Sequence, residues 1–116
     1  MTADNIAKLI YETRFRFMDE RTLQDQIEEV LKENTVEHTR EKSLNLKDRI
    51  DFLCGTVGIE VKIAGSQQAV QRQLWRYAGD DRISSLVLVT TRSGHFMPES
   101  INTKPIFVVH LLHSIF

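Results

Sequence analysis

Two acidic residues and a lysine flank a short glycine-containing segment in the middle of the chain. Asp51 precedes this segment, and Glu60 and Lys62 follow it. Two carboxylates brought close together repel each other unless a cation lies between them, and hard oxygen ligands favour magnesium or manganese. A lysine beside them supplies positive charge that stabilises a phosphate during hydrolysis. The three residues therefore predict a metal-dependent site that acts on phosphodiester bonds.

Two predicted strands carry these residues. Residues 49–53 and 59–63 are rich in Ile, Val and Phe, and glycines between them suit a tight connection between antiparallel strands. Side chains alternate between the faces of a strand, so Glu60 and Lys62 point the same way, and Asp51 reaches them across the turn. An isolated Glu-x-Lys is usually a surface ion pair on an edge strand. The nearby aspartate and the following helix favour a site instead.

A predicted helix follows the second strand. Ser66 caps it, and it runs to about Ala78 with an apolar face turned inward. Gln73 and Tyr77 are one turn apart and project from the same side. The Gln73 amide interrupts the apolar stripe, where it must find a hydrogen-bond partner. Two interpretations remain open: the pair reaches the metal or the scissile phosphate, or it is a satisfied edge of the core.

The rest of the chain predicts a single α/β domain, residues 19–116, preceded by a helical arm or dimerisation segment, residues 1–18. The expected elements outside the site are a helix from Asp19 or Thr22 to about Asn34, with Thr22 and Asp25 at capping-box spacing, and strands over 35–42, 84–91 and 105–112. The order is helix, three strands, helix and two strands. A strand, helix and further strand predict a crossover within a mixed sheet.

The composition limits the possible functions. The 116 residues, 41% hydrophobic and 27% charged, are enough for one globular domain with a real core. The net charge of -1 gives no global attraction to nucleic acid, so binding needs a local basic patch. The lone Cys54 excludes an internal disulfide and a cysteine-based zinc site. With no long apolar run and no secretion signal, we expect a soluble cytoplasmic protein without membrane partners.

Residues 51–62 followed by Gln73-x-x-x-Tyr77 resemble the PD-(D/E)xK nuclease superfamily. The helical motif is similar to that of its RecB-like and virus-type replication-repair branches. The resemblance covers roughly residues 20–91. It implies a restriction-endonuclease-like core and hydrolysis of DNA with Mg²⁺ or Mn²⁺, without an organic cofactor.

The resemblance also implies roles for individual residues. Asp51 and Glu60 match the metal ligands, with the backbone carbonyl of Val61 assisting, and Lys62 matches the catalytic lysine. Gln73 and Tyr77 match the supporting helix. The residue before the aspartate is isoleucine rather than the proline of the superfamily's name.

The superfamily places a glutamate on its first core helix near the metal. Glu20, Gln24 and Glu28 follow one another at four-residue intervals beside the apolar stripe of the first core helix, so each is a candidate. Glu20 with Gln24 resembles the virus-type pattern most. Most glutamates on such a helix are simply solvated.

A basic rim is expected around the site. Arg76 and Arg92 are candidates for contacts with the DNA backbone, although helix arginines are usually solvated. His95, three residues after Arg92, either touches phosphate beside it or lies exposed.

The leading hypothesis is a magnesium-dependent deoxyribonuclease, expected as a homodimer because so small a domain offers little surface to grip a duplex. The first alternative is a module of the same fold that binds branched or broken DNA without cutting it. The second is a protein-interaction scaffold whose acidic patch is vestigial. Loss of cleavage in Lys62→Ala with the fold intact separates the enzyme from both.

Overall fold

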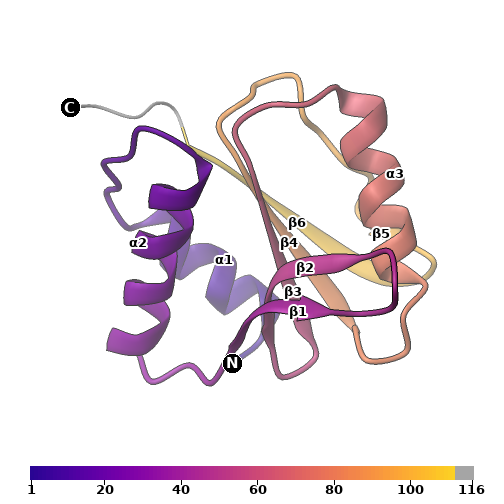
Figure 1. Ribbon diagram of the computed structural model, residues 1–116, viewed down its shortest axis with the longest axis horizontal. Coiled ribbons are helices and arrows are strands. Elements are labelled where there is room, and N and C mark those ends of the chain that lie inside the picture. Colours follow the sequence, from indigo (N-terminus) through magenta and orange to yellow (C-terminus); the bar gives the residue numbers. More distant parts are fainter. Residues whose placement is uncertain (112–116) are drawn as a thin grey trace.

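The computed structural model describes residues 1–111. Its elements are α1 (Ala3–Tyr11), α2 (Glu20–Glu33), β1 (Thr39–Ser43), β2 (Arg49–Cys54), β3 (Val57–Lys62), α3 (Gln67–Ala78), β4 (Ser85–Thr90), β5 (Ser100–Ile101) and β6 (Lys104–His110). The strands form one sheet in the order β1-β2-β3-β4-β6-β5 (Figure 1). Neighbouring strands are parallel in the pairs β3–β4 and β4–β6 and antiparallel in the other three. The expected mixed α/β class is confirmed.

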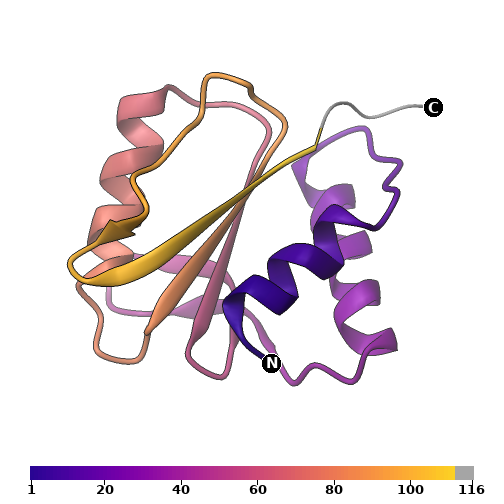
Figure 2. The same cartoon turned by 180° about the vertical axis from the view of Figure 1, so that it is seen from behind.

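Helices cover both faces of the sheet. Figures 1 and 2 show α1 and α2 on one side and α3 on the other. The central strand β4 is buried along its whole length, with Val87 and Val89 in the core under α1 and α2 and Leu86 and Leu88 in the core under α3. Such a continuous apolar strand is typical of a parallel strand covered on both faces. The sheet therefore separates two apolar cores.

The N-terminal segment contributes to the first of these cores. Residues 1–18, expected as a helical arm or dimerisation segment, supply six buried side chains: Ala3, Ile6, Ala7, Ile10, Phe15 and Phe17. The four of these that lie in α1, from Ala3 to Ile10, form one apolar face of the helix, which packs against β4 and β6. No helix within residues 1–111 is long and apolar enough to cross a membrane.

The start of α2 is fixed by a reciprocal cap. The Asp19 carboxylate accepts a hydrogen bond from the Thr22 N–H at 2.8 Å, and the Thr22 hydroxyl accepts one from the Asp19 N–H at 3.2 Å. The expected capping-box pairing of Thr22 with Asp25 is wrong, because Asp25 pairs with Arg40 of β1 at 2.7 Å. The cap makes Glu20 the first residue of α2.

Most remaining elements lie close to their expected positions. The helix α3 begins after Ser66 and ends at Ala78, as predicted. The strand expected over 105–112 is β6, which ends at His110, and Leu112 lies outside the described residues. The short strand β5 was not expected from the sequence. It pairs only with β6.

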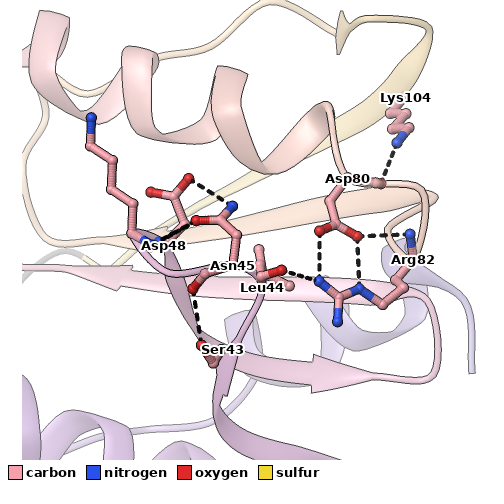
Figure 3. A network of polar contacts seen from close by, with 8 residues as sticks. Ser43, Leu44, Asn45, Asp48, Asp80, Arg82 and Lys104 are labelled. Carbon is pink, nitrogen blue, oxygen red and sulfur yellow. Dashed lines mark hydrogen bonds and ion pairs between the residues drawn. The ribbon is translucent and has the colours of Figure 1, made fainter.

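A polar network joins the β1–β2 turn to the segment after α3 (Figure 3). Arg82 pairs with the Asp80 carboxylate at 2.8 Å and donates a hydrogen bond to the Leu44 carbonyl in the turn. The guanidinium lowers the pKa of Asp80 to about 2. Beside this network, Arg76 of α3 donates to the buried carboxylate of Asp48 at 3.0 Å. These links fix α3 relative to the beginning of β2.

Candidate active site

The strands β2 and β3 separate at one end of their ladder. The last backbone pair there joins Phe52 to Ile59, so Asp51 and Glu60 are next in register. At this position the backbone N–H groups donate to carboxylates instead of to backbone carbonyls. The Asp51 N–H donates to Glu60 Oε1 at 3.2 Å, and the Val61 N–H donates to Asp51 Oδ2 at 2.8 Å. The two predicted carboxylates therefore lie together, facing the gap between the strands.

The alternation of side chains between the two faces of the sheet is interrupted in β2 at Asp51. Phe52 packs in the core under α1 and α2, whereas Ile50 packs in the core under α3. In a regular strand both side chains would point to the same face. On the neighbouring strand, Glu41 has a left-handed backbone with φ of 52°. The distortion on both strands surrounds Asp51 and turns its side chain toward β3.

The lysine of the predicted site is bound to its glutamate. Lys62 Nζ lies 3.1 Å from Glu60 Oε2. The Glu60 side chain is 3% exposed and that of Lys62 is 21% exposed. The ammonium group thus forms the outer, solvent-accessible part of the pair. It is placed to meet a molecule that approaches from outside.

Burial raises the pKa of both carboxyl groups. For Glu60 the pKa rises to about 8, chiefly through loss of solvent and then through the nearby Asp51 charge, while Lys62 opposes the rise. For Asp51 it rises to about 6, again chiefly by burial, against the hydrogen bond from the Val61 N–H. The charge of Glu20 raises it further. A positive ion close to the Asp51 and Glu60 carboxyl groups would therefore be favourable.

Of the three candidate residues on α2, Glu20 contacts the end of β3 that carries the site. Glu20 Oε1 accepts a hydrogen bond from the Ile63 N–H, immediately after β3, at 3.4 Å. Gln24 and Glu28 instead accept hydrogen bonds from Arg40 at 3.3 Å and 3.2 Å. Glu20 is therefore the glutamate of α2 nearest to the site.

Gln73 and Tyr77 of α3 form a hydrogen-bonded chain. The Gln73 amide donates to the Tyr77 hydroxyl at 2.7 Å, and this hydroxyl donates to the Arg49 carbonyl at 2.9 Å. Burial and then the charge of Glu60 raise the pKa of Tyr77. These two hydrogen bonds link α3 to Arg49, the first residue of β2. The Gln73 amide has its required partner, and the Tyr77 hydroxyl lies within the electrostatic reach of Glu60.

The donor set suits a hard divalent cation. Within residues 1–111 no group of three or more His, Cys, Asp or Glu side chains is arranged to hold a metal ion. Mg²⁺, however, is usually bound through one or two carboxylates and completes its shell with water and substrate phosphate. Asp51 and Glu60 provide two carboxylates. The Val61 N–H donates to Asp51, and since the N–H and carbonyl of one strand residue point the same way, the Val61 carbonyl could serve as a third oxygen donor.

Sequence reasoning missed Glu41 as a neighbour of the site. Its charge contributes to the raised pKa of Asp51, and its own carboxylate pairs with Arg49 at 3.3 Å. The residue lies in a weakly patterned strand, where nothing in the sequence indicates the left-handed backbone. No sequence signal could have identified it.

The two arginines of the expected basic rim differ in their surroundings. Arg76 is held by Asp48, as described above. Arg92 lies exposed on the segment after β4, where its backbone N–H donates to the Thr90 hydroxyl at 3.0 Å. Both side chains are exposed, and among the described residues an ion pair holds that of Arg76 but not that of Arg92.

His95 was expected either to contact phosphate or to lie exposed, and both expectations are wrong. The ring is 2% exposed, so it is neither on the surface nor available to phosphate. Its Nδ1 lies 2.7 Å from the Thr90 hydroxyl and its Nε2 lies 2.7 Å from the Gly65 carbonyl. His95 therefore joins the segment after β4 to Gly65 in the segment after β3.

A groove of about 920 Å³ opens at the opposite end of β2. It lies between the end of α2 and the turn after β2, and Val36, His38, Lys42 and Leu53 are among its lining residues. None of the predicted site residues lines it. The candidate active site is instead the gap where β2 and β3 separate.

No protein-family model, characterised protein or solved structure matches the chain. The site must therefore be interpreted from its own geometry and chemistry. Its defining features are two facing carboxylates with raised pKa values and a lysine that is partly open to solvent.

Proposed function

We propose that this chain is a metal-dependent nuclease that hydrolyses DNA phosphodiester bonds, built on a restriction-endonuclease-like core. The observation that carries the proposal is the pair of facing carboxylates, Asp51 and Glu60, with Lys62 bound to the second. A buried glutamate and a half-buried aspartate, both with raised pKa values and beside a partly exposed lysine, are a costly arrangement for a purely structural ion pair. The same arrangement is useful where a cation and a phosphate meet.

Each residue has a role in this proposal. Asp51, Glu60 and the Val61 carbonyl would hold Mg²⁺ or Mn²⁺, with Glu20 close by. When bound, the ion would supply Lewis acidity to a phosphate oxygen and lower the pKa of a water molecule. Lys62 extends from the pair toward solvent, where its charge stabilises the negative charge that develops on the phosphate.

The surrounding residues position this centre and the substrate. Gln73 and Tyr77 hold the beginning of β2, and therefore Asp51, through the Arg49 carbonyl. Arg92 and Arg76 are the proposed contacts to the DNA backbone, and Arg76 is also paired with Asp48. We further propose that the protein acts in the cytoplasm as a homodimer, because two copies place two sites on the two strands of a duplex.

A cleavage assay with matched lysine variants tests the proposal. Supercoiled plasmid and labelled branched DNA are incubated with the purified chain in Mg²⁺, in Mn²⁺ and in EDTA. We expect cleavage in either ion and none in EDTA. Lys62→Ala should lower the rate at least about 100-fold with an unchanged circular dichroism spectrum. Lys47→Ala, which removes an exposed lysine in the β1–β2 turn, should cleave normally.

Three outcomes would overturn the proposal. Equal cleavage by Lys62→Ala and the parent chain would place the activity elsewhere. DNA binding that survives in Asp51→Asn, with no cleavage in either ion, would assign a non-cleaving DNA-binding module. Absence of any affinity for DNA would favour a protein-interaction scaffold.

A further inference from the structure

The helix α3 differs in charge from the other two helices. It contains Arg72, Arg76 and four glutamines but no acidic residue, whereas α1 contains Asp4 and α2 contains five acidic residues. Figure 1 shows α3 alone on its face of the sheet, with its outer side turned to solvent. The outer side of α3 thus combines positive charge with neutral hydrogen-bonding amides, which suits a polyanion.

An exposed tryptophan lies on this outer side. Trp75 is 66% exposed, while its neighbours in the inward stripe, Leu74 and Tyr77, are fully buried. Arg72 is one turn earlier on the same surface, and within residues 1–111 none of the ion pairs involves it. A large aromatic face therefore adjoins an unpaired guanidinium group.

A second exposed aromatic side chain lies at the other end of α3. Phe96 is also 66% exposed. Its backbone is held against the first turn of α3, because the Gln67 side chain accepts a hydrogen bond from the Phe96 N–H at 2.9 Å and donates one to the Phe96 carbonyl. The surface along α3 thus has an aromatic side chain at each end and cationic and amide groups between them.

We propose that the outer face of α3 binds an unpaired DNA strand, with a base stacked on Trp75 and a phosphate bound to Arg72. Stacking on a protein side chain requires a base that is free of its partner, whereas a duplex offers only its backbone and groove edges. The chain as a whole has a net charge of -1 and no general attraction for duplex DNA. The local chemistry therefore favours a single strand.

This inference rests on the proposed function, because it makes the α3 surface a path to the cleavage site. Arg72 is followed by Gln73, on the flank of α3 that contacts Tyr77 and the beginning of β2. A helix with its side chains is about 10–12 Å wide, so a strand that crosses α3 reaches this flank within a few nucleotides. The substrate class is then DNA with a single-stranded segment.

The fluorescence of Trp75 reports on this surface directly, because it is the only tryptophan of the chain. The full chain is titrated in EDTA, where no cleavage is expected, with a mixed-sequence strand of about 15 nucleotides and with its blunt duplex. We expect the strand to quench the fluorescence by stacking, and the duplex to leave it nearly unchanged. Equal or stronger quenching by the duplex, or none by the strand, would overturn the inference.

Matched variants locate the contacts. Trp75→Ala should weaken binding of a labelled strand roughly 5- to 100-fold, measured by fluorescence anisotropy. Tyr11→Ala removes an aromatic side chain of similar exposure, 69%, from α1 on the opposite layer and should bind normally. Arg72→Gln should reduce the salt slope of strand binding by about 0.7. Equal affinity of the Trp75 and Tyr11 variants would contradict a role for α3.

The two proposals fail separately in these experiments. Magnesium-dependent cleavage without quenching in EDTA would overturn strand binding by α3 and leave the nuclease. Quenching and loss of affinity in Trp75→Ala, without cleavage in Mg²⁺ or Mn²⁺, would overturn the nuclease and leave strand binding by α3.

Discussion

Glu60 accepts a hydrogen bond from the backbone N–H of Asp51 at 3.2 Å, at the first step where β2 and β3 no longer form a backbone ladder. The Asp51 carboxylate in turn accepts the N–H of the residue after Glu60. The two carboxylates therefore complete the hydrogen bonding between β2 and β3, in addition to the chemical role that we propose for them. Truncation to alanine would leave buried N–H groups unpaired, so tests of their chemistry require the isosteric variants Asp51→Asn and Glu60→Gln.

The raised pKa values of Glu60 and Asp51 predict a stability that falls with increasing pH in EDTA. Both carboxyl groups bind a proton more tightly in the folded chain than in the unfolded chain. Their contribution is complete below about pH 4 and is lost progressively as the pH rises to about 6 for Asp51 and about 8 for Glu60. We expect the thermal midpoint to fall over this interval.

Glu60→Gln removes the titrating group with the larger shift. The thermal midpoint of this variant should depend less on pH, and above about pH 8 the variant should be more stable than the parent chain. Glu29→Gln, at an exposed position of α2, should keep the parent's dependence. A midpoint of the parent chain that rises between about pH 5 and 8 would contradict the raised pKa values.

Tyr77→Phe tests the link between α3 and β2. The substitution leaves the Arg49 carbonyl without its donor and the Gln73 amide without its acceptor. We expect the free energy of unfolding to fall by about 1–3 kcal/mol in urea denaturation, with slower DNA cleavage. Tyr11→Phe removes the hydroxyl of an exposed tyrosine and should change neither quantity. Equal stability of the two variants would mean that the buried hydrogen bonds of Tyr77 contribute nothing.

Thr103→Gly should stabilise the β5–β6 hairpin. Asn102 and Thr103 have φ values of 53° and 64° between the paired residues Ile101 and Lys104, which is the left-handed pattern of a type I′ turn. A β-branched side chain is strained there, whereas Asn-Gly is the preferred sequence. We expect a gain of about 1 kcal/mol in the free energy of unfolding. Thr103→Ala retains a Cβ atom and should gain much less, and a loss of stability in the glycine variant would refute the strain.

Local patterns in the sequence are sufficient to predict which residues lie together in the central part of the candidate site. Glu60 and Lys62 lie on one face because side chains alternate along a strand, and the glycine-containing turn brings Asp51 close to both within eleven residues of chain. The helix α3 could also be predicted from local patterns, because Ser66 caps it and its apolar residues recur at helical spacing. Short-range geometry fixes both features.

Features that depend on distant contacts could not be predicted. The change of orientation in β2 lies opposite the left-handed backbone of Glu41 on the neighbouring strand, and no local pattern indicates either feature. The burial of His95 depends on Gly65, thirty residues earlier in the chain. The packing of α1 on the sheet is also a long-range outcome, because an amphipathic helix shows which of its faces is buried but not what covers it.

Anomalous diffraction from crystals soaked in Mn²⁺ tests the central claim most directly. The account predicts a manganese peak in the gap between β2 and β3, within coordination distance of oxygen atoms of Asp51 and Glu60. The peak should be absent from Asp51→Asn crystals under the same conditions. An unaltered gap at saturating Mn²⁺, with Lys62 still bound to Glu60 and no peak beside either carboxylate, would contradict the account.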